Sequence, residues 1–290
     1  MPAGNIIYAS DISTLRTTLN TILNGNSVAS GYNQATSISA NPASGDIIDD
    51  AYYDSVYAAT SKITNYYNIL NPLTAVSAPN LIYSTEYADQ ASSLNSSLNT
   101  RHSVPWTYSA GWDTTTATEL TSAISNWNGS KTFDFNIAFS STAHMNSWFT
   151  AGGEIRISAS HSSSATPQAT SWQQLCTELG TFRISVRPTD TTDTNLSVRK
   201  LYNDLTGTYG TIKLVYADAI SYATNYIQIQ AYKTTTTVYV RVIINDAHTN
   251  SWSDIVSGTT TCTVSSLKLS NTVGSVNITN PTFTATAVFV

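Results

Sequence analysis

In the first hundred residues, apolar positions recur every three or four residues, which is the period of an amphipathic helix. Ser10 and Asp11 precede the first of these runs as candidate N-caps, Asn24-Gly25 ends it, and Pro72 follows the second. The predicted helices cover residues 12–22, 48–70 and 85–99. We therefore expect a small helical region over residues 1–100 that serves attachment or oligomerisation.

From residue 101 onward the apolar period changes to two, which is typical of half-buried strands. Two short helices are expected between these strands, because capping boxes at Thr116-x-x-Glu119 and Thr170-x-x-Gln173 precede apolar positions at helical spacing. The alternating runs lie at residues 133–139, 155–157, 182–186, 212–216, 227–231, 238–244, 262–264 and 283–289. These eight runs predict an antiparallel β-sandwich over residues 101–290 with short helical crossovers, and hence an α+β fold.

Two segments of the helical region are candidates for contacts between subunits. Residues 26–46 form a long loop rich in Ser, Gly, Asn and Pro, which is typical of a binding loop or an arm. The helix over 48–70 carries more tyrosines than one apolar stripe can bury. The interface candidates are Tyr53, Tyr57 and Tyr67 on this helix and Tyr32 and Asn33 in the loop. They predict a homo-oligomer, either a trimer or a larger symmetric ring.

The polar residues are unusual in kind. Ser, Thr and Asn together make up about 37% of the 290 residues, whereas charged residues make up only 11%, against about 25% in typical soluble domains. A surface of hydroxyls and amides suits extracellular or particle-assembly proteins. The net charge of −5, without a basic stripe, argues against nucleic acid as a partner. We also expect no membrane span, because no run of about 18 apolar residues exists, and no secretion signal at the N-terminus.

The sequence contains no strong catalytic or metal-binding motif. The four histidines are scattered singly and lack metal-ligand spacing, and no Gly-x-Ser-x-Gly elbow accompanies them. Aspartates at residues 49–54 are explained by the dipole of the helix that they begin, and the oxygen-rich loop 190–195 is better explained as a turn than as a calcium site. The histidines are His102, His144, His161 and His248. We expect no catalytic residues, no cofactor and no metal.

The cysteines and tryptophans are better explained by structural roles than by catalysis or ligand binding. Cys176 and Cys262 are expected to be small buried side chains, although a disulfide between them stays open. The six tryptophans could offer stacking platforms for sugars, but in a sandwich aromatic rings more often fill the core or a seam between subunits.

Several segments at both ends of the chain resemble a widespread group of virion structural proteins of tailed phages, especially marine, cyanophage-like ones. The resemblance implies a non-enzymatic building block of a tail, neck, baseplate or fibre, and this group has no catalytic motif to transfer. It also implies other phage structural proteins as partners and a place in the virion, which is assembled in the host cytoplasm. The segments are Ile6–Asp11, Ile22–Gly25, Gly31–Gln34, Phe149–Ser158, Trp172-x-x-Leu175 and Tyr209-x-x-Ile212.

The sequence therefore predicts a structural component whose helical part anchors it and whose β-domain packs or projects. The alternative is a glycan-binding or receptor-binding adhesin module of a tail fibre, which would contact host glycans through exposed Trp and Asn side chains. A third hypothesis, a glycosidase or other depolymerase, requires two carboxylates that face each other across a groove.

Overall fold

The computed structural model describes ten stretches of the chain, and these belong to two compact units. The helical unit comprises Met1–Asp113, Asn146–Gly152 and Leu269–Thr279, and the sandwich unit comprises Thr114–Met145, Gly153–Lys268 and Asn280–Val290. The described residues are 9–25, 31–34, 38, 50–67, 119–162, 166–186, 199–218, 220–248, 255–268 and 277–288.

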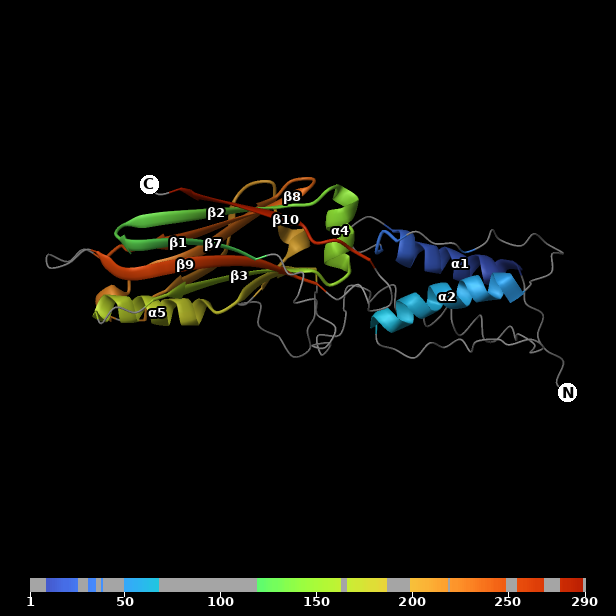
Figure 1. Ribbon diagram of the computed structural model, residues 1–290, viewed down its shortest axis with the longest axis horizontal. Helices are drawn as coiled ribbons and strands as arrows, with labels where there is room; N and C mark the ends of the chain where they lie inside the picture. Colours follow the sequence, from blue (N-terminus) through green and yellow to red (C-terminus); the bar gives the residue numbers. More distant parts are fainter. Residues whose placement is uncertain are drawn as a thin grey trace. The chain divides into compact units, whose positions relative to one another are not determined.

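Two of the predicted helices are present in the helical unit. Helix α1 covers Ala9–Asn24, helix α2 covers Asp50–Tyr67, and the two pack against each other (Figure 1). Their buried residues follow the predicted stripes: Leu15, Leu19 and Ile22 on α1, and Tyr52, Val56, Ala59 and Ile63 on α2. Ser10 and Asp11 lie inside α1 and do not precede it. The predicted helix over 85–99 and the boundary at residue 100 lie outside the described residues.

The segment after α1 folds back onto the end of that helix. The backbone amides of Tyr32 and Gln34 donate to the last carbonyls of α1, at 3.0 and 2.6 Å. Gly31 allows this approach, because a Cβ there would lie 2.6 Å from the Cα of Gly25. The Gln34 side chain then exchanges two hydrogen bonds with the backbone of Asn277, at 3.0 and 3.1 Å. Residues 243 positions apart in the sequence are thus joined within this unit.

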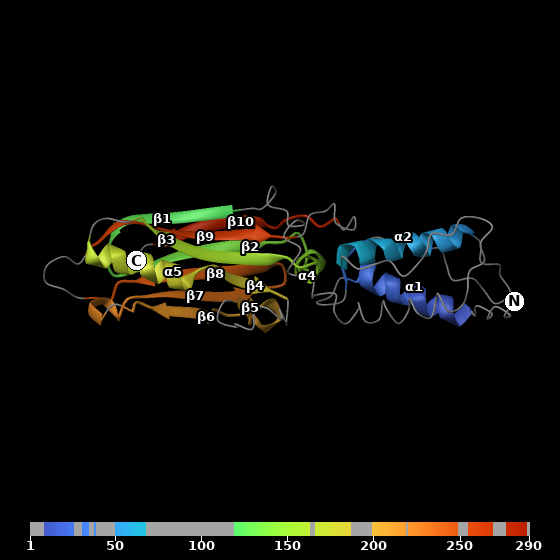
Figure 2. The same ribbon diagram turned by 90° about the horizontal axis from the view of Figure 1, so that it is seen from below.

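The sandwich unit consists of two five-stranded sheets (Figures 1 and 2). Every strand pairing is antiparallel except that between β4 and β5, which is parallel. Sheet one has the order β1 (Glu119–Trp127), β9 (Val256–Leu267), β3 (Glu154–His161), β4 (Phe182–Ser185) and β5 (Arg199–Leu201). Sheet two has the order β10 (Thr282–Val288), β2 (Ser130–Ala138), β8 (Thr237–Asn245), β7 (Tyr226–Lys233) and β6 (Gly210–Tyr216). The predicted α+β fold with a β-sandwich is therefore confirmed.

The core of the sandwich is built from the predicted apolar phases. Alternate residues of the central strands are buried, and the residues between them face outward. Register places these phases side by side, so that Phe135 pairs with Val240, and Ile157 pairs with Val264. The buried strand residues include Phe133, Phe135, Ile137, Ile155, Ile157, Ile227, Ile229, Val238, Val240, Val242, Ile244 and Val264. Burial of this apolar surface is the main stabilising contribution to the fold.

Helix α5 (Pro167–Leu179) is the crossover that was predicted after residue 170, although its cap differs. The N-cap is Thr166, whose side chain accepts a hydrogen bond from the Ala169 amide at 3.2 Å, and Pro167 occupies the first turn. Thr170 lies inside the helix and donates to the Thr166 carbonyl instead. Gly180 ends the helix with φ of 58°. Helix α5 contacts β3 and β9 and also β6 and β7 of the other sheet.

The helix predicted at Leu120, Ile124 and Trp127 is wrong, because these residues belong to strand β1. Leu120 and Ile124 lie on the same side of the strand. Residues four positions apart share one side of a strand as well as one side of a helix, so this spacing does not distinguish the two structures. The register then shifts between Ser125 and Trp127, with Asn126 at φ of 50°. This bulge turns Trp127 to the buried side and so reproduces a helical spacing in an extended chain.

Helix α4 (Thr142–Thr150) lies between β2 and β3 in the sequence. None of the helices in the described part of the chain is long and apolar enough to span a membrane.

Candidate binding surfaces of the sandwich

The outward side of sheet two carries a row of tyrosines and amides. Because Ile227, Ile229 and Ala231 of β7 point inward, the residues between them point outward. We call this surface the tyrosine stripe; it comprises Tyr226, Gln228, Gln230 and Tyr232 of β7 with Asp134, Tyr209, Tyr216, Tyr239 and Arg241 beside them.

Three rings are packed together at one end of the stripe. Tyr232 and Tyr239 are partners across β7 and β8, and their rings stack with centroids 4.3 Å apart and planes 2° apart. The Tyr209 ring meets Tyr232 edge-on at 4.6 Å. The Arg241 guanidinium lies over the Tyr209 ring, 4.2 Å from its centroid. The rings therefore fix one another, and only part of each is exposed.

An ion pair completes this end. Arg241 Nε and Nη2 donate to the two carboxylate oxygens of Asp134, at 2.7 and 2.9 Å, from the facing position on β2. This bidentate pairing cancels both charges and uses two of the five donors of the guanidinium. Burial, followed by the charge of Asp134, raises the pKa of Tyr209 to about 12, so this phenol stays protonated at neutral pH.

The other end of the stripe is more exposed. The Tyr216 and Tyr226 rings lie edge-on at 5.7 Å, and Tyr216 is 53% exposed. The prediction that Ile212, Leu214 and Tyr216 form the inward phase of this strand is wrong. A bulge between Thr211 and Lys213 shifts the register, so Leu214 faces outward opposite Gln228.

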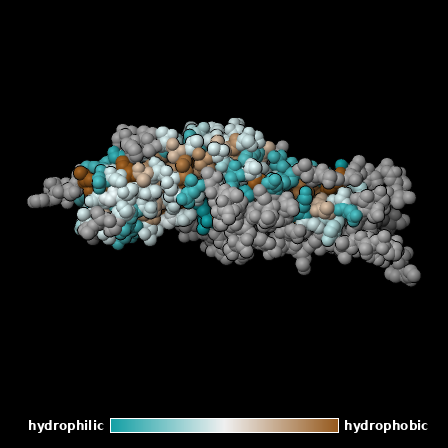
Figure 3. Space-filling view, in the orientation of Figure 1, coloured by the Kyte–Doolittle hydropathy of each residue, from teal (hydrophilic) through white to brown (hydrophobic). Residues whose placement is uncertain are grey.

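The outward side of sheet one has a different composition. We call its uncharged part the hydroxyl face, which comprises Thr121, Ala123 and Ser125 of β1, Thr259, Thr261, Thr263 and Ser265 of β9, and Ser158 and Ser160 of β3. The hydroxyl face ends at Ser265, whose partners on the two neighbouring strands are Glu119 and Arg156. Register places these side chains in rows, so that Thr263 lies between Thr121 and Ser158. The hydroxyl oxygens of Ser125 and Thr259 are 2.7 Å apart and share a hydrogen bond. In Figure 3 most of the described surface of the sandwich is pale or teal, as expected for Ser, Thr and Tyr.

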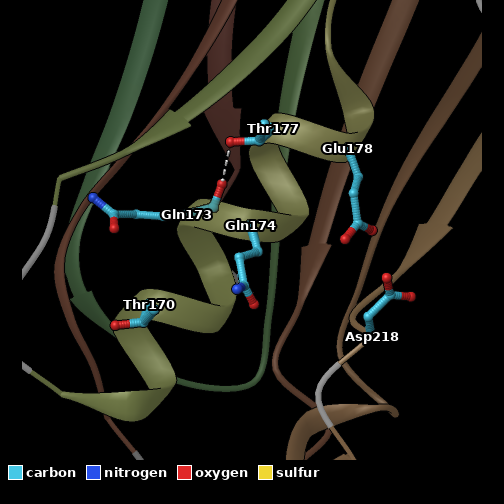
Figure 4. A pocket seen from close by; sticks show the side chains of 6 residues that line it. All are labelled: Thr170, Gln173, Gln174, Thr177, Glu178 and Asp218. Carbon is cyan, nitrogen blue, oxygen red and sulfur yellow. Dashed lines mark hydrogen bonds between the residues drawn. The ribbon is translucent and has the colours of Figure 1, made fainter.

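A hollow of about 420 Å³ lies beside α5 and is lined by polar residues (Figure 4). Its wall on the helix includes Thr177, whose hydroxyl donates to the Gln173 carbonyl at 2.8 Å. The carboxyl groups of Glu178 and Asp218 point toward each other across one side of the hollow. The lining residues are Thr170, Gln173, Gln174, Thr177, Glu178 and Asp218.

The two carboxyls affect each other's titration. Desolvation and the nearby Asp218 carboxyl raise the pKa of Glu178. Glycosidases place two carboxyls on either side of the glycosidic bond, about 5 Å or more apart. A depolymerase activity at this pair stays a prediction.

His161 has a structural role. The Trp127 indole N–H donates to the Thr260 hydroxyl oxygen at 3.0 Å, and this hydroxyl lies 2.9 Å from His161 Nδ1. The other ring nitrogen, Nε2, lies 3.1 Å from the Ser257 carbonyl, which can only accept. Nε2 therefore carries a proton, and in the neutral ring Nδ1 accepts from the Thr260 hydroxyl. Burial lowers the pKa of His161, in agreement with this neutral form.

Both cysteines are free and buried, which confirms the interpretation as small core side chains. Cys176 lies on α5, and burial raises its pKa to about 12. Burial also raises the pKa of Cys262, with the nearby Cys176 as a further cause. Neither thiol has the lowered pKa of a reactive cysteine.

The predicted interface residues fall in different environments. Tyr32 is fully buried in the helical unit, because the chain folds back at this point, so its ring is a core side chain in the isolated chain. Asn33 beside it is exposed, and Tyr57 on α2 is half-buried. The side chains of Tyr53 and Tyr67 lie outside the described residues. A contact of Asn33 or Tyr57 with another subunit stays a prediction.

The remaining candidates add no site. Trp127, Trp148 and Trp172 are buried, so these three rings fill cores and offer no platform to a sugar. Within the residues that the structure describes, no group of three or more His, Cys, Asp or Glu side chains could hold a metal ion. The oxygen-rich loop over 190–195 lies outside those residues.

The tyrosine stripe was missed at the sequence level, although a signal exists. The apolar phase of the run Tyr226-Ile-Gln-Ile-Gln-Ala-Tyr232 predicts a strand, and its outward phase consists of Tyr, Gln, Gln and Tyr. A comparison of the chain with protein families, curated proteins and solved structures gave no significant match. Function must therefore be argued from these surfaces.

Proposed function

We propose that the chain is a non-enzymatic structural component of a tailed-phage virion, part of a tail, neck or fibre assembly. In this proposal the helical part anchors the chain and the sandwich packs beside copies of itself or other phage structural proteins. The observation that carries the proposal is the hydroxyl face, a regular surface of small uncharged side chains. The resemblance of the two ends of the chain to phage structural proteins supports the same assignment.

The hydroxyl face suits a seam between subunits because two hydroxyl groups that pair with each other are desolvated at a small cost in free energy. An ion pair buried at an interface must repay a large desolvation penalty, whereas a hydroxyl needs only one hydrogen-bond partner. The central row, Thr259, Thr261 and Thr263, presents short side chains with little conformational entropy to lose. A second sheet or a neighbouring subunit can therefore approach this surface closely.

Charge introduced into this row tests the seam. Lysine at both Thr261 and Thr263 should lower the assembled mass of the purified full chain measured by light scattering. Thr224→Lys, at an exposed turn position outside the face, is the matched control and should assemble like the wild type. Normal assembly of the Thr261→Lys/Thr263→Lys variant would contradict the seam.

Two further measurements address the other parts of the proposal. Tyr53→Ala with Tyr57→Ala should lower the assembled mass if the helical part also contributes contacts. Immunogold electron microscopy, with antibody against the chain, should label one place on phage particles that carry its gene. Particles that stay unlabelled, both intact and partly disrupted, would remove the virion assignment.

A further inference from the structure

The tyrosine stripe combines aromatic rings with planar amides in one line along β7. Gln228 and Gln230 occupy the middle, and tyrosines flank them at both ends. Tyr226 and Tyr232 are six residues apart on one strand, which corresponds to about 20 Å. The surface is therefore long enough for several units of an extended polymer.

The chemistry of the stripe is that of a neutral, polar and partly apolar ligand. Tyrosine offers an apolar ring and a hydroxyl that both donates and accepts. Each Gln amide also donates and accepts, and Gln228 Nε2 already donates to the Thr211 hydroxyl at 2.7 Å, which positions its side chain. Ligands that carry many hydroxyls beside faces of C–H groups match this combination.

The charges of the stripe lead to the same ligand class. The one cation, Arg241, is paired through two hydrogen bonds with Asp134, so the described stripe carries no net charge. A polyanion such as nucleic acid or an acidic polysaccharide would need uncompensated basic groups. A surface without net charge is complementary to an uncharged ligand.

The rings are also held in place before a ligand arrives. The stacking of Tyr232 on Tyr239 and the packing of Arg241 on Tyr209 restrict all four side chains. Binding to such a surface costs less conformational entropy than binding to free side chains. The hydroxyl face has no comparable platform, because its side chains are small.

We propose that the tyrosine stripe binds a neutral oligosaccharide, which lies along β7 and stacks on the tyrosines at its two ends. Gln228, Gln230 and the remaining donors of Arg241 bond the sugar hydroxyls between those ends. This inference goes beyond the proposed structural role, since a binding surface of this kind does not depend on the seam at the hydroxyl face.

The test is isothermal titration calorimetry of the full chain with neutral hexasaccharides of glucose, mannose, galactose and N-acetylglucosamine, and with hexagalacturonate as the charged control. We expect at least one neutral hexasaccharide to bind and hexagalacturonate not to bind. Tyr232→Ala and Gln230→Ala should each weaken that binding by about tenfold. Gln174→Ala, which removes an exposed amide from α5, should leave it unchanged.

Three results would overturn the proposal. The first is the absence of binding by every neutral hexasaccharide at millimolar concentration. The second is binding that Gln230→Ala leaves intact, since this outward-facing substitution does not disturb the core. The third is a drop in assembled mass caused by Tyr232→Ala or Gln230→Ala without any loss of sugar binding, which would make the stripe a contact between copies. Normal assembly of the Thr261→Lys/Thr263→Lys variant with retained sugar binding would refute only the proposed structural role.

Discussion

The two outer faces of the sandwich follow the same rule with different residues. On both sheets, inward positions are apolar and outward positions are polar, with the period of two that a pleated strand imposes. On sheet one the outward positions along β9 are Thr and Ser, with Glu119, Arg156 and Arg183 at one end, and on sheet two they include Tyr, Gln, Arg and Asp. The inward phase specifies the fold, and the outward phase is free to differ between the faces.

This difference shows how each face is held together. The hydroxyl face lies over a buried hydrogen-bond chain, from Trp127 through Thr260 to His161, and strand β9 comes close to the Ser162 backbone at Gly258. The tyrosine stripe is held by contacts among its own outward side chains. Substitutions should therefore damage the two faces by different routes and to different extents.

The largest loss of stability is expected from Gly258→Ala beneath the hydroxyl face. Gly258 has φ of 99°, and an added Cβ would collide with the Ser162 carbonyl oxygen. The strained backbone and the clash together should lower the free energy of unfolding by about 4 kcal/mol. Urea denaturation followed by circular dichroism measures this loss.

Gly207→Ala is the matched control, because a Cβ at that position meets nothing within 4 Å. It should leave the stability nearly unchanged. Equal stabilities for the two variants would mean that the backbone at Gly258 in β9 does not constrain sheet one.

A smaller effect is expected from Thr260→Val in the buried hydrogen-bond chain. Valine has the same shape but removes the hydroxyl that bonds both Trp127 and His161. Two buried polar groups then lose this partner, which should cost about 2 kcal/mol. Thr261→Val, one residue along on the outward side, should cost less than about 0.5 kcal/mol. Similar losses for both variants, in the same urea experiment, would contradict the assigned role of Thr260.

The sequence predicted the inward phase well, because alternation and helical spacing report which side of an element is buried. Alternation predicts strands β2, β3, β4, β7, β8, β9 and β10, and also strand β6 although not its inward phase, and helical spacing predicts helices α1, α2 and α5. The errors lie at bulges. Before Leu214 an extra residue on β6 changes the phase. Beside Trp127 the extra residue lies on the partner strand β9, and Asn126 adopts a φ of 50°. No local signal in the sequence marks either irregularity. Strand β5 has only three residues and was missed for that reason.

The candidate surfaces were harder to predict, because they depend on which strands become neighbours. Tyr209, Tyr232 and Tyr239 meet only because β6, β7 and β8 are adjacent in sheet two. The hydroxyl face likewise joins β1, β9 and β3, which are distant in the sequence. The composition shows that Ser, Thr and Tyr are abundant, and the order of the strands in the two sheets places them on separate faces.

An intermediate effect is expected from the ion pair of the tyrosine stripe. Arg241 and Asp134 are partly exposed, with side-chain exposures of 33% and 18%, so solvent screens their attraction. A double-mutant cycle with Asp134→Asn and Arg241→Gln should give a coupling free energy of about 1 kcal/mol. Chemical denaturation of the four proteins supplies the values. A coupling near zero would show that ring packing alone holds this end of the stripe.

A pH-dependent change in stability is expected under alkaline conditions, and it should separate the two faces. The pKa of Tyr209 is raised from 10.0 to about 12, mainly by burial, so the folded state favours the protonated phenol. This contribution to stability is complete below pH 10 and is lost as the pH rises from 10 toward 12. Tyr209→Phe should remove that part of the pH dependence, measured as the free energy of unfolding between those pH values. Thr263→Val on the hydroxyl face should keep the wild-type profile, because a threonine hydroxyl does not titrate in this range. A profile unchanged by Tyr209→Phe would show that this phenol is not stabilised in the folded state.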